Sequence, residues 1–234
     1  MKNLKSEALF LMLGMAIMGF FIWLGLSHVS KDVRTVNVKG LAEMEVKADR
    51  VYWPINIKVV GNDLIAVYNE VNAKNIIVER FLKDNGISES EISINAPRVQ
   101  DREADYYSNN DYNMRYNVTS TITVSSSNID LVRNLMSRQG ELIKQGVAIA
   151  NGDFYTDQVS FIYSDLNSIK PQMIEEATKN ARAAAEKFAF DSNSKLGKIK
   201  TATQGQFSIS DRDDNTPYIK TVRVVTNVTY FLED

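Results

Sequence analysis

The segment Ala8–Ser27, which reads ALFLMLGMAIMGFFIWLGLS, contains no charged side chain. A helix rises about 1.5 Å per residue, so a run of this length spans about 30 Å, the thickness of the hydrocarbon core of a bilayer. A helix buried in a globular domain normally keeps one polar face, and this segment has none. The sequence therefore predicts an N-terminal membrane-directing helix over residues 1–29 and one globular domain over residues 30–234.

Two functions fit this helix. A secretory signal peptide has a charged start, an apolar core of roughly 7–15 residues and small residues before the cleavage site, and Gly25 and Ser27 fit the last requirement. An uncleaved anchor needs about twenty apolar residues, which Ala8–Ser27 supplies. We therefore expect a transmembrane anchor followed by an exported domain, and a soluble exported protein after cleavage is the alternative.

Composition excludes several classes of function. The 27 basic and 29 acidic residues give a net charge of −2, which is not typical of a nucleic-acid-binding protein. The chain has no cysteine, and its one histidine is His28, beside the apolar run. Disulfides, thiolate chemistry and imidazole catalysis are therefore excluded from the domain, and we expect no catalytic residue, no cofactor and no metal site.

Alternating apolar residues predict strands, and apolar residues at helical spacing predict helices. Three helices are expected at residues 63–86, 127–140 and 171–190, beginning at Asp63, Ser127 and Pro171. The strands are expected at residues 35–39, 46–59, 92–99, 112–124, 147–150, 159–163, 199–209 and 219–232. Hairpins between helices predict an α+β fold, with largely antiparallel sheets and three helices on a sheet face, preceded by the N-terminal transmembrane or signal helix.

Several single residues refine this prediction. Gly40 is expected to end the first strand, and Asn151–Gly152 is expected to form the type I′ turn of a hairpin. The apolar phase changes between Asp49 and Arg50, which predicts a β-bulge or bend. Pro54 has no N–H to donate, so its strand should lie at an edge or contain a bulge.

Two elements have distinct faces. One face of the strand that starts at Tyr112 is expected to pack on the core, and the other to meet water. The core face comprises Tyr112, Met114, Tyr116, Val118, Ile122 and Val124, and the water face comprises Asn113, Arg115, Asn117, Thr119, Thr121 and Thr123. The third helix has an alanine-rich face of Ile174, Ala177, Ala181, Ala184, Ala185 and Phe188. That face is expected to cover a sheet inside the domain rather than to contact another subunit.

Three segments carry a family resemblance. Gly86–Ile94 reads GISESEISI and forms a turn after the first expected helix. Asn180–Ile199 reads NARAAAEKFAFDSNSKLGKI, an alanine-rich helix followed by Leu-Gly-Lys, and Val36–Val51 reads VNVKGLAEMEVKADRV, an opening strand pair. Over roughly residues 34–233 these patterns resemble the SIMPL (DUF541) domain family.

This resemblance implies a bacterial periplasmic or surface-exposed protein, with links to oxidative-stress tolerance and self-assembly and with no established catalytic residue. We therefore expect a non-enzymatic protein of the bacterial inner membrane, with its domain in the periplasm or exterior and a structural, interaction or stress-tolerance role. It should contact the membrane through Ala8–Ser27, form a homo-oligomer and bind no nucleic acid. The alternatives are a soluble periplasmic location after cleavage, and a carboxylate-based hydrolase or ligand-binding enzyme.

The segment Asp211–Asn215, DRDDN, resembles the start of a calcium-binding loop. An EF-hand loop counted from Asp211 needs glycine at its sixth place and glutamate at its twelfth, where this chain has Thr216 and Val222. A solvated turn before Pro217 is therefore expected instead.

The loop Asp101–Asp111 combines acidic residues with Tyr106 and Tyr107. Exposed tyrosines with polar neighbours suit contact surfaces, and long loops are often functional. The loop is therefore a candidate interaction surface, and a hairpin tip kept soluble by its charges is the alternative.

The remaining polar candidates favour structural interpretations. The pairs Glu43/Glu45 and Glu175/Glu176 could serve acid–base chemistry, but they are expected to be surface charges. The glycosylation patterns Asn117-Val-Thr119 and Asn227-Val-Thr229 fall inside strands, which favours ordinary polar strand residues.

Methionines could scavenge oxidants, because oxidation converts the thioether into a polar sulfoxide. Met44, Met114 and Met136 are the candidates. We expect most of them to be buried, which argues against a sacrificial role.

Overall fold

The computed structural model describes residues 3–29, 34–104, 113–150 and 158–233, with side chains in the first range given for Ala8–Leu24. The sequence predicted one domain over residues 30–234, and the contacts group the chain into two compact units. Unit 1 comprises residues 1–41, 175–205 and 225–234. Unit 2 comprises residues 42–174 and 206–224.

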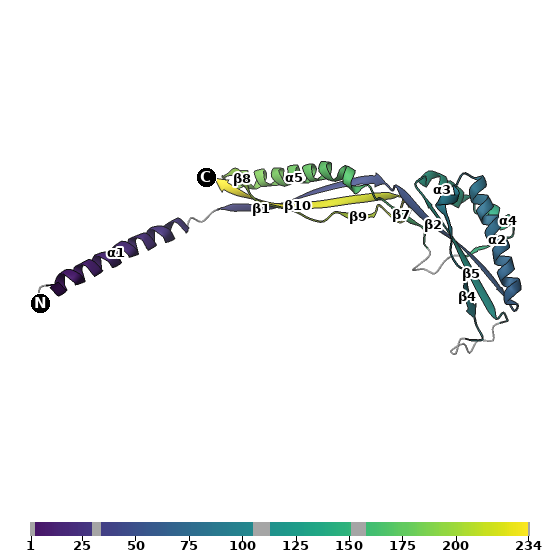
Figure 1. Cartoon of the computed structure of the whole chain (residues 1–234). Helices are drawn as coiled ribbons and strands as arrows, with labels where there is room; N and C mark the ends of the chain where they lie inside the picture. Colours follow the sequence, from purple (N-terminus) through teal and green to yellow (C-terminus); the bar gives the residue numbers. More distant parts are fainter. Residues whose placement is uncertain (1–2, 30–33, 105–112, 151–157, 234) are drawn as a thin grey trace. The chain divides into compact units, whose positions relative to one another are not determined.

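The fold is α+β, and the strand pairs are antiparallel, as the sequence predicted (Figure 1). The helices are α1 (Asn3–Val29), α2 (Leu64–Asp84), α3 (Ile129–Ser137), α4 (Gly140–Lys144) and α5 (Leu166–Asp191), with a 3₁₀ turn at Glu89–Glu91. The strands are β1 (Thr35–Lys47), β2 (Arg50–Gly61), β3 (Ile92–Ile94), β4 (Arg98–Asp101), β5 (Tyr116–Ser126), β6 (Ile149–Ala150), β7 (Ser160–Ile162), β8 (Lys195–Gln204), β9 (Ser208–Asp211) and β10 (Ile219–Glu233).

Helix α1 corresponds to the predicted N-terminal helix. Its described large apolar side chains up to Trp23 are exposed, from Ile17 at 50% to Phe10 at 70%. They belong to neither hydrophobic core. Within the described residues, no helix combines the length and the hydropathy that a membrane span requires.

The larger sheet, in unit 2, has the order β3-β5-β2-β6, with β4 also paired to β5 and β7 to β2. β2 and β5 pair without interruption from Val51↔Ser126 to Gly61↔Tyr116. Alternate residues of both strands face the core, and α2 lies along this face (Figure 1). The largest fully buried side chains here include Trp53, Ile55, Ile57, Leu82, Ile122, Leu135 and Leu142.

The predicted faces of β5 are confirmed from Val118 onwards, because the even-numbered residues are buried and the threonines between them are not. Met114 was assigned to the core face wrongly, since its side chain is 41% exposed, and Tyr112 lies outside the described residues. The strand begins at Tyr116 rather than at Tyr112, since its partner β2 ends at Gly61, opposite Tyr116. Beyond this point the N–H of Arg115 donates to Oδ1 of Asn62 at 2.9 Å instead of to a strand.

Pro54 pairs with Thr123 of β5 without a bulge, so its strand as a whole does not lie at an edge of the sheet. On the opposite side of β2, β7 pairs as far as Tyr52 and β6 pairs from Asn56 onwards. The described pairing on that side therefore leaves out Pro54, which has no N–H to offer. β6 and β7 both pair with β2 instead of forming the expected hairpin, and Asn151–Gly152 lies outside the described residues.

The strand predicted at residues 92–99 is divided into β3 and β4. Ile92 pairs with Val124 and Arg98 with Thr119, so the register on β5 shifts by one residue between them. Pro97 lies at this shift, and its missing N–H and fixed φ account for the break.

The predicted ends of α2 are confirmed. Oδ1 of Asp63 accepts two first-turn N–H groups, at 2.9 and 3.1 Å, and Gly86 follows the helix with a φ of 94°. The next helix, α3, is capped by Asn128 rather than by Ser127. Gly140 does not end the helical region, because a further helix, α4, begins there.

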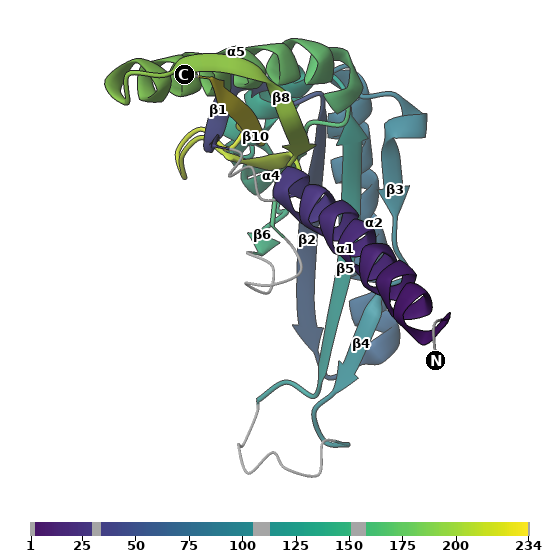
Figure 2. The same cartoon turned by 90° about the vertical axis from the view of Figure 1, so that its left-hand side faces the viewer.

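The smaller sheet has the order β1-β10-β8, and β9 also pairs with β10. In unit 1, α5 lies along one face of β1, β10 and β8 (Figures 1 and 2). The buried residues of this core are Val38, Ala181, Ala185, Val228 and Tyr230. The predicted final strand at residues 219–232 is confirmed by β10.

Gly40 lies inside β1 and does not end it, so that prediction is wrong. A Cβ at this position would lie 1.8 Å from the carbonyl oxygen of Ala177 and 2.5 Å from the backbone nitrogen of Ala181. Glycine is therefore present because the helix backbone lies against the strand backbone here. The predicted break at Asp49–Arg50 is confirmed, since β1 ends at Lys47.

Helix α5 begins at Leu166 and contains Pro171, which was expected to start it. The carboxylate of Asp49 accepts the N–H groups of Ser164 at 2.7 Å and Asp165 at 2.9 Å, just before the helix. This distant residue therefore holds the segment that leads into the helix.

The alanine face of α5 is confirmed, with Ala177, Ala181 and Ala185 fully buried inside unit 1. Phe188 was assigned to this face wrongly, because its side chain is 60% exposed. Ala189 is buried in its place, which continues the spacing of four residues.

The strand predicted at residues 199–209 starts earlier, at Lys195, and is divided into β8 and β9. The N–H of Gly205 donates to the carbonyl oxygen of Val225 at 2.8 Å just after β8 ends. A Cβ on Gly205 would lie 2.8 Å from that oxygen, so glycine suits this position, where the register on β10 shifts by one residue between β8 and β9.

Candidate functional site

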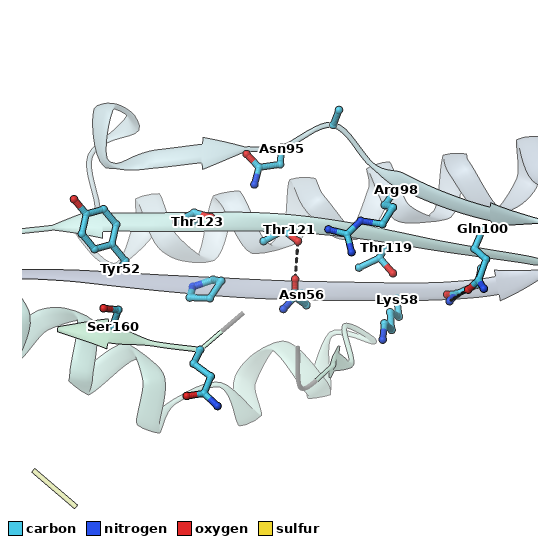
Figure 3. A pocket seen from close by; sticks show the side chains of 14 residues that line it. Tyr52, Asn56, Lys58, Asn95, Arg98, Gln100, Thr119, Thr121, Thr123 and Ser160 are labelled. Carbon is cyan, nitrogen blue, oxygen red and sulfur yellow. Dashed lines mark hydrogen bonds between the residues drawn. The ribbon is translucent and has the colours of Figure 1, made fainter. Parts of the chain in front are cut away.

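The candidate site is a cavity with a volume of about 530 Å³ on the face of the unit 2 sheet opposite the core (Figure 3). It is here called the polar groove. Its lining residues come from β2, β5, β4, β7 and the segments beside β3 and β7. They are Tyr52, Pro54, Asn56, Lys58, Asn95, Ala96, Arg98, Gln100, Asn117, Thr119, Thr121, Thr123, Gln158 and Ser160.

Strand periodicity explains how these residues come together. Side chains of a strand alternate between faces, so the even residues of β2 and the odd residues of β5 reach the groove while their neighbours reach the core. Pairing then sets them side by side: Asn56 lies opposite Thr121, and Lys58 lies opposite Thr119. The register of one long strand pair therefore builds most of the groove.

The centre of the groove contains a hydrogen-bonded pair. The hydroxyl of Thr121 donates to Oδ1 of Asn56 at 2.6 Å (Figure 3). Asn56 is only 2% exposed, so its amide group is held in one orientation by its surroundings. This arrangement leaves the amide Nδ2 as a donor and the Thr121 oxygen as an acceptor.

One end of the groove is cationic. Lys58 and Arg98 are both paired to Thr119, from the strands on either side of β5. Neighbouring strands lie about 4.8 Å apart, which sets the two cationic residues about 10 Å apart across the groove floor. Within the described residues neither cation has an ion-pair partner, and no carboxylate lines the groove.

The Asp211–Asn215 segment forms a turn, as predicted. Asp213 accepts the N–H groups of Asn215 at 2.9 Å and Thr216 at 2.8 Å, and it also binds the Thr216 hydroxyl. The hydrogen bond from Thr216 and the ion pair with Arg212 lower the pKa of Asp213 to about 2. Asp211 pairs with Lys220 instead of facing a common centre.

No cluster of three or more potential metal ligands exists in the described ranges of the chain. This finding agrees with the failed match to an EF-hand loop. That the protein needs no metal remains a prediction.

The acidic loop is described as far as Ala104, and Tyr106 and Tyr107 lie outside the described residues. At its base, Arg115 binds Asp101 and Glu103, each at 2.8 Å. The hydrogen bond from Arg115 lowers the pKa of Asp101. The base of the loop is therefore fixed by an ion-pair cluster, and its role as a contact surface remains a prediction.

The predicted surface glutamates are confirmed as exposed. Glu43 pairs with Arg223 at 3.5 Å, and Glu45 pairs with Arg212 at 3.3 Å. Glu175 pairs with Lys179 one helical turn away. Such exposed pairs contribute little to stability and do not form a catalytic carboxylate pair.

The two glycosylation patterns lie inside strands, as predicted. Asn117 and Thr119 belong to the polar face of β5. Thr229, in β10, accepts a hydrogen bond from Asn37 at 2.9 Å. Both patterns are therefore accounted for by strand structure.

The methionine prediction is wrong in its main point. Met114 is 41% exposed, and Met44 and Met136 are only half-buried. Met114 lies before β5, where the pairing with β2 has already ended. The scavenging hypothesis therefore keeps one accessible candidate.

Every described carboxylate with a shifted pKa is shifted downwards, and none is poised to act as a general acid at neutral pH. In Asp49, partial burial raises the pKa, but the hydrogen bonds from Ser164 and Asp165 outweigh it and leave a lower value. In Glu91, the hydrogen bond from Ser126 is the main cause of the lowered pKa. These carboxylates are ionised caps and ion-pair partners.

The polar groove was missed by the sequence analysis. The threonines of β5 were recognised as a water-facing row, but the row was not matched with Asn56 and Lys58 because the register of β2 on β5 was unknown. Pro54 signalled an irregular strand and not a binding surface. A signal was nevertheless present, since the even positions of β2 contain polar residues where the odd ones are apolar.

A model of the SIMPL family, described as "Protein of unknown function (DUF541)", matches residues 36–230. No curated protein gives a significant match to the chain. The family match includes residues of both units and covers the segments Gly86–Ile94 and Asn180–Ile199, in which the resemblance was first seen. This chain therefore belongs to the SIMPL family.

Proposed function

We propose that this protein is a non-enzymatic interaction protein of the bacterial envelope, attached to the inner membrane with its SIMPL domain in the periplasm or exterior. The polar groove of unit 2 is its binding surface. The observation that carries this proposal is the composition of the groove, which gathers amide, hydroxyl and cationic groups in one concavity and contains no carboxylate among its lining residues. Such a site can bind a polar ligand, but it lacks an acid–base pair.

The chemistry of the remaining chain supports a binding role. The domain has no cysteine or histidine, and the described carboxylates with shifted pKa values favour the ionised state. A carboxylate hydrolase would need one carboxyl group with a raised pKa. The hydrolase alternative therefore has no candidate pair to carry it in the described residues.

The test of this function uses the purified full chain in detergent. Chromogenic ester, phosphate and glycoside substrates should show no turnover, whereas a panel of envelope glycans should include a ligand that raises the melting temperature. Asn56→Ala should abolish that stabilisation. Turnover that disappears on substitution of a carboxylate would replace this function with the hydrolase alternative.

Membrane attachment is supported by the uncharged run Ala8–Ser27 and by the exposure of the apolar side chains of α1. The anchor predicts that the mature protein starts at Met1 and resists carbonate extraction. A mature N-terminus at His28 with a soluble protein would establish the cleaved-signal alternative. A soluble protein that still starts at Met1 would overturn membrane attachment.

Self-association is supported by apolar side chains on the outer surface of α2, where Ile65 is 73% exposed and Ile76 is 56% exposed. The two residues lie about three helical turns apart on one face of α2, and exposed apolar side chains on one face are typical of protein contact sites. Sedimentation of the full chain in detergent should show a discrete oligomer, which Ile65→Ser with Ile76→Ser should dissociate. A monomer at all concentrations would exclude self-association.

A stress-tolerance role depends on Met114, the most exposed of the three candidate methionines. Mild peroxide should oxidise Met114 before Met44 and Met136, which can be followed by peptide mass spectrometry. Equal oxidation of the three residues would remove the argument for a scavenging methionine.

A further inference from the structure

The cationic end of the polar groove is built for an anionic group. Lys58 and Arg98 flank Thr119 on adjacent strands, and Figure 3 shows all three toward the same end of the groove. Two like charges on one face repel each other, and a bound anion between them would remove this repulsion. Since no described carboxylate pairs with either cation, both are available to an anionic group of a ligand.

The centre of the groove is suited to hydroxyl groups. A hydroxyl both donates and accepts hydrogen bonds, and the buried pair of Asn56 and Thr121 offers a donor and an acceptor side by side. Asn56 Nδ2 has no hydrogen-bond partner among the described residues. A ligand hydroxyl at this position would satisfy both groups at once.

The far end of the groove is less polar. Tyr52 and Pro54 line it and are partly exposed, so they present ring faces beside the hydroxyl site. The apolar C–H face of a sugar ring can pack on such side chains, while its hydroxyl groups remain free to hydrogen-bond. From Tyr52 to Lys58 the strand extends about 20 Å, at about 3.3 Å per residue, which is long enough for several sugar rings.

The groove is less suited to a peptide. Extended peptides that bind sheets obtain most of their affinity from main-chain hydrogen bonds at a sheet edge. The polar groove is instead a sheet face, on which the backbone groups of β2 and β5 are already paired with each other. Its side-chain donors and acceptors therefore favour a ligand that is itself rich in hydroxyl groups.

We infer that the polar groove binds a short acidic oligosaccharide, with a sugar carboxylate between Lys58 and Arg98 and sugar hydroxyls at Asn56 and Thr121. This inference rests on the proposed function of the groove as a binding surface, and it names the class of ligand.

The test is calorimetric titration of the full chain in detergent with a short oligogalacturonate. A neutral galactose oligomer of the same length should bind at least about tenfold more weakly, because it loses the charge-assisted contacts. Lys58→Gln and Arg98→Gln should each weaken oligogalacturonate binding about tenfold. Added salt should reduce the affinity, since both cations are exposed.

Arg80→Gln is the matched control, because Arg80 is an exposed cation on α2 and does not line the groove. Arg80→Gln removes one positive charge, as Lys58→Gln and Arg98→Gln do, and it should leave the affinity for oligogalacturonate unchanged. An equal loss in Arg80→Gln would show a nonspecific charge effect and would overturn the inference. Equal binding of inorganic phosphate or a short polyglutamate peptide would also overturn it, since either result would remove the sugar specificity.

Two further outcomes separate this inference from the proposed function. If the neutral oligomer binds as well as the acidic one, and only Asn56→Ala weakens it, the groove remains a binding surface but the acidic ligand class is wrong. If no glycan binds and the groove variants melt like the parent chain with every ligand, both the inference and the proposed function fail.

Discussion

The two units pack a helix on a sheet in opposite ways. In unit 2, α2 packs on β2 and β5 through large side chains, among them Phe81 and Leu82 of the helix and Trp53 of β2. In unit 1, the buried residues of α5 are alanines, and the facing strand contributes Gly40. Large side chains fill the space between backbones, whereas alanine and glycine allow the backbones to approach. Unit 1 should therefore be sensitive to added atoms, and unit 2 to lost apolar contacts or introduced charge.

The largest effect is expected from a charge in the unit 2 core. Val118 is fully buried, and Val118→Asp should lower the free energy of unfolding by several kcal/mol, about 4 or more, because an unpaired carboxylate cannot be solvated there. Thr119→Asp, the adjacent residue on the opposite face, should cost far less. Urea unfolding compares the two variants, and equal losses would disprove the register of β5.

A single methyl group should produce the next largest effect, in unit 1. Gly40→Ala places a carbon 1.8 Å from the carbonyl oxygen of Ala177, so the helix must move. The expected loss in unfolding free energy is about 3 kcal/mol, at the upper end of overpacking effects. Gly140→Ala is the control, since a Cβ there meets nothing within 4 Å. If thermal melting shows the same stability for both variants, close packing of α5 is refuted.

Ala181→Leu tests the same contact through the helix. Ala181 is fully buried in unit 1, and the added methylenes should cost about 2 kcal/mol. Ala183→Leu, on the exposed side of α5, should be close to neutral. Melting curves and sizing should be recorded together. A folded protein that merely changes its oligomeric state would assign this face to a subunit contact instead.

The smallest effect concerns Asp49, whose carboxylate accepts hydrogen bonds from the segment just before α5. Asp49→Asn should cost about 1 kcal/mol at neutral pH, because it weakens these charge-assisted hydrogen bonds. Because the pKa of Asp49 is lowered in the folded state, its stabilising contribution is complete above the unfolded pKa of about 3.9 and is lost as the pH falls through the lower folded value. The difference between parent and variant should therefore vanish in acid. A difference that grows as the pH falls would contradict this assignment.

The sequence correctly predicted those elements whose determinants lie close together along the chain. Asp63 caps α2 as expected, and alternation predicted the buried face of β5 correctly from Val118 onwards. Errors arose where a distant segment decides the structure. Gly40 lies against the backbone of Ala177, and Asp49 holds the segment before α5, and neither partner is close in sequence.

The polar groove could be predicted only in part for the same reason. The row of threonines on β5 is visible in the sequence, and so is the polar phase of β2. Their combination depends on which residues of two strands, separated by a helix and two short strands, pair with each other. Arg98 depends in addition on the one-residue register shift at Pro97, which alternation alone does not reveal.

The position of β1 beside β10 also sets an order of events for a chain that is synthesised from its N-terminus. Asn37 and Thr229 are hydrogen-bonded across 192 residues of sequence, and the N–H of Leu232 donates to the carbonyl oxygen of Arg34. β2 can pair as soon as Ser126 has been synthesised, whereas β1 has no strand partner until nearly the whole chain has been made. Loss of the last ten residues would therefore leave the first half of β1, Thr35–Leu41, as an unpaired edge that is prone to pairing with other chains.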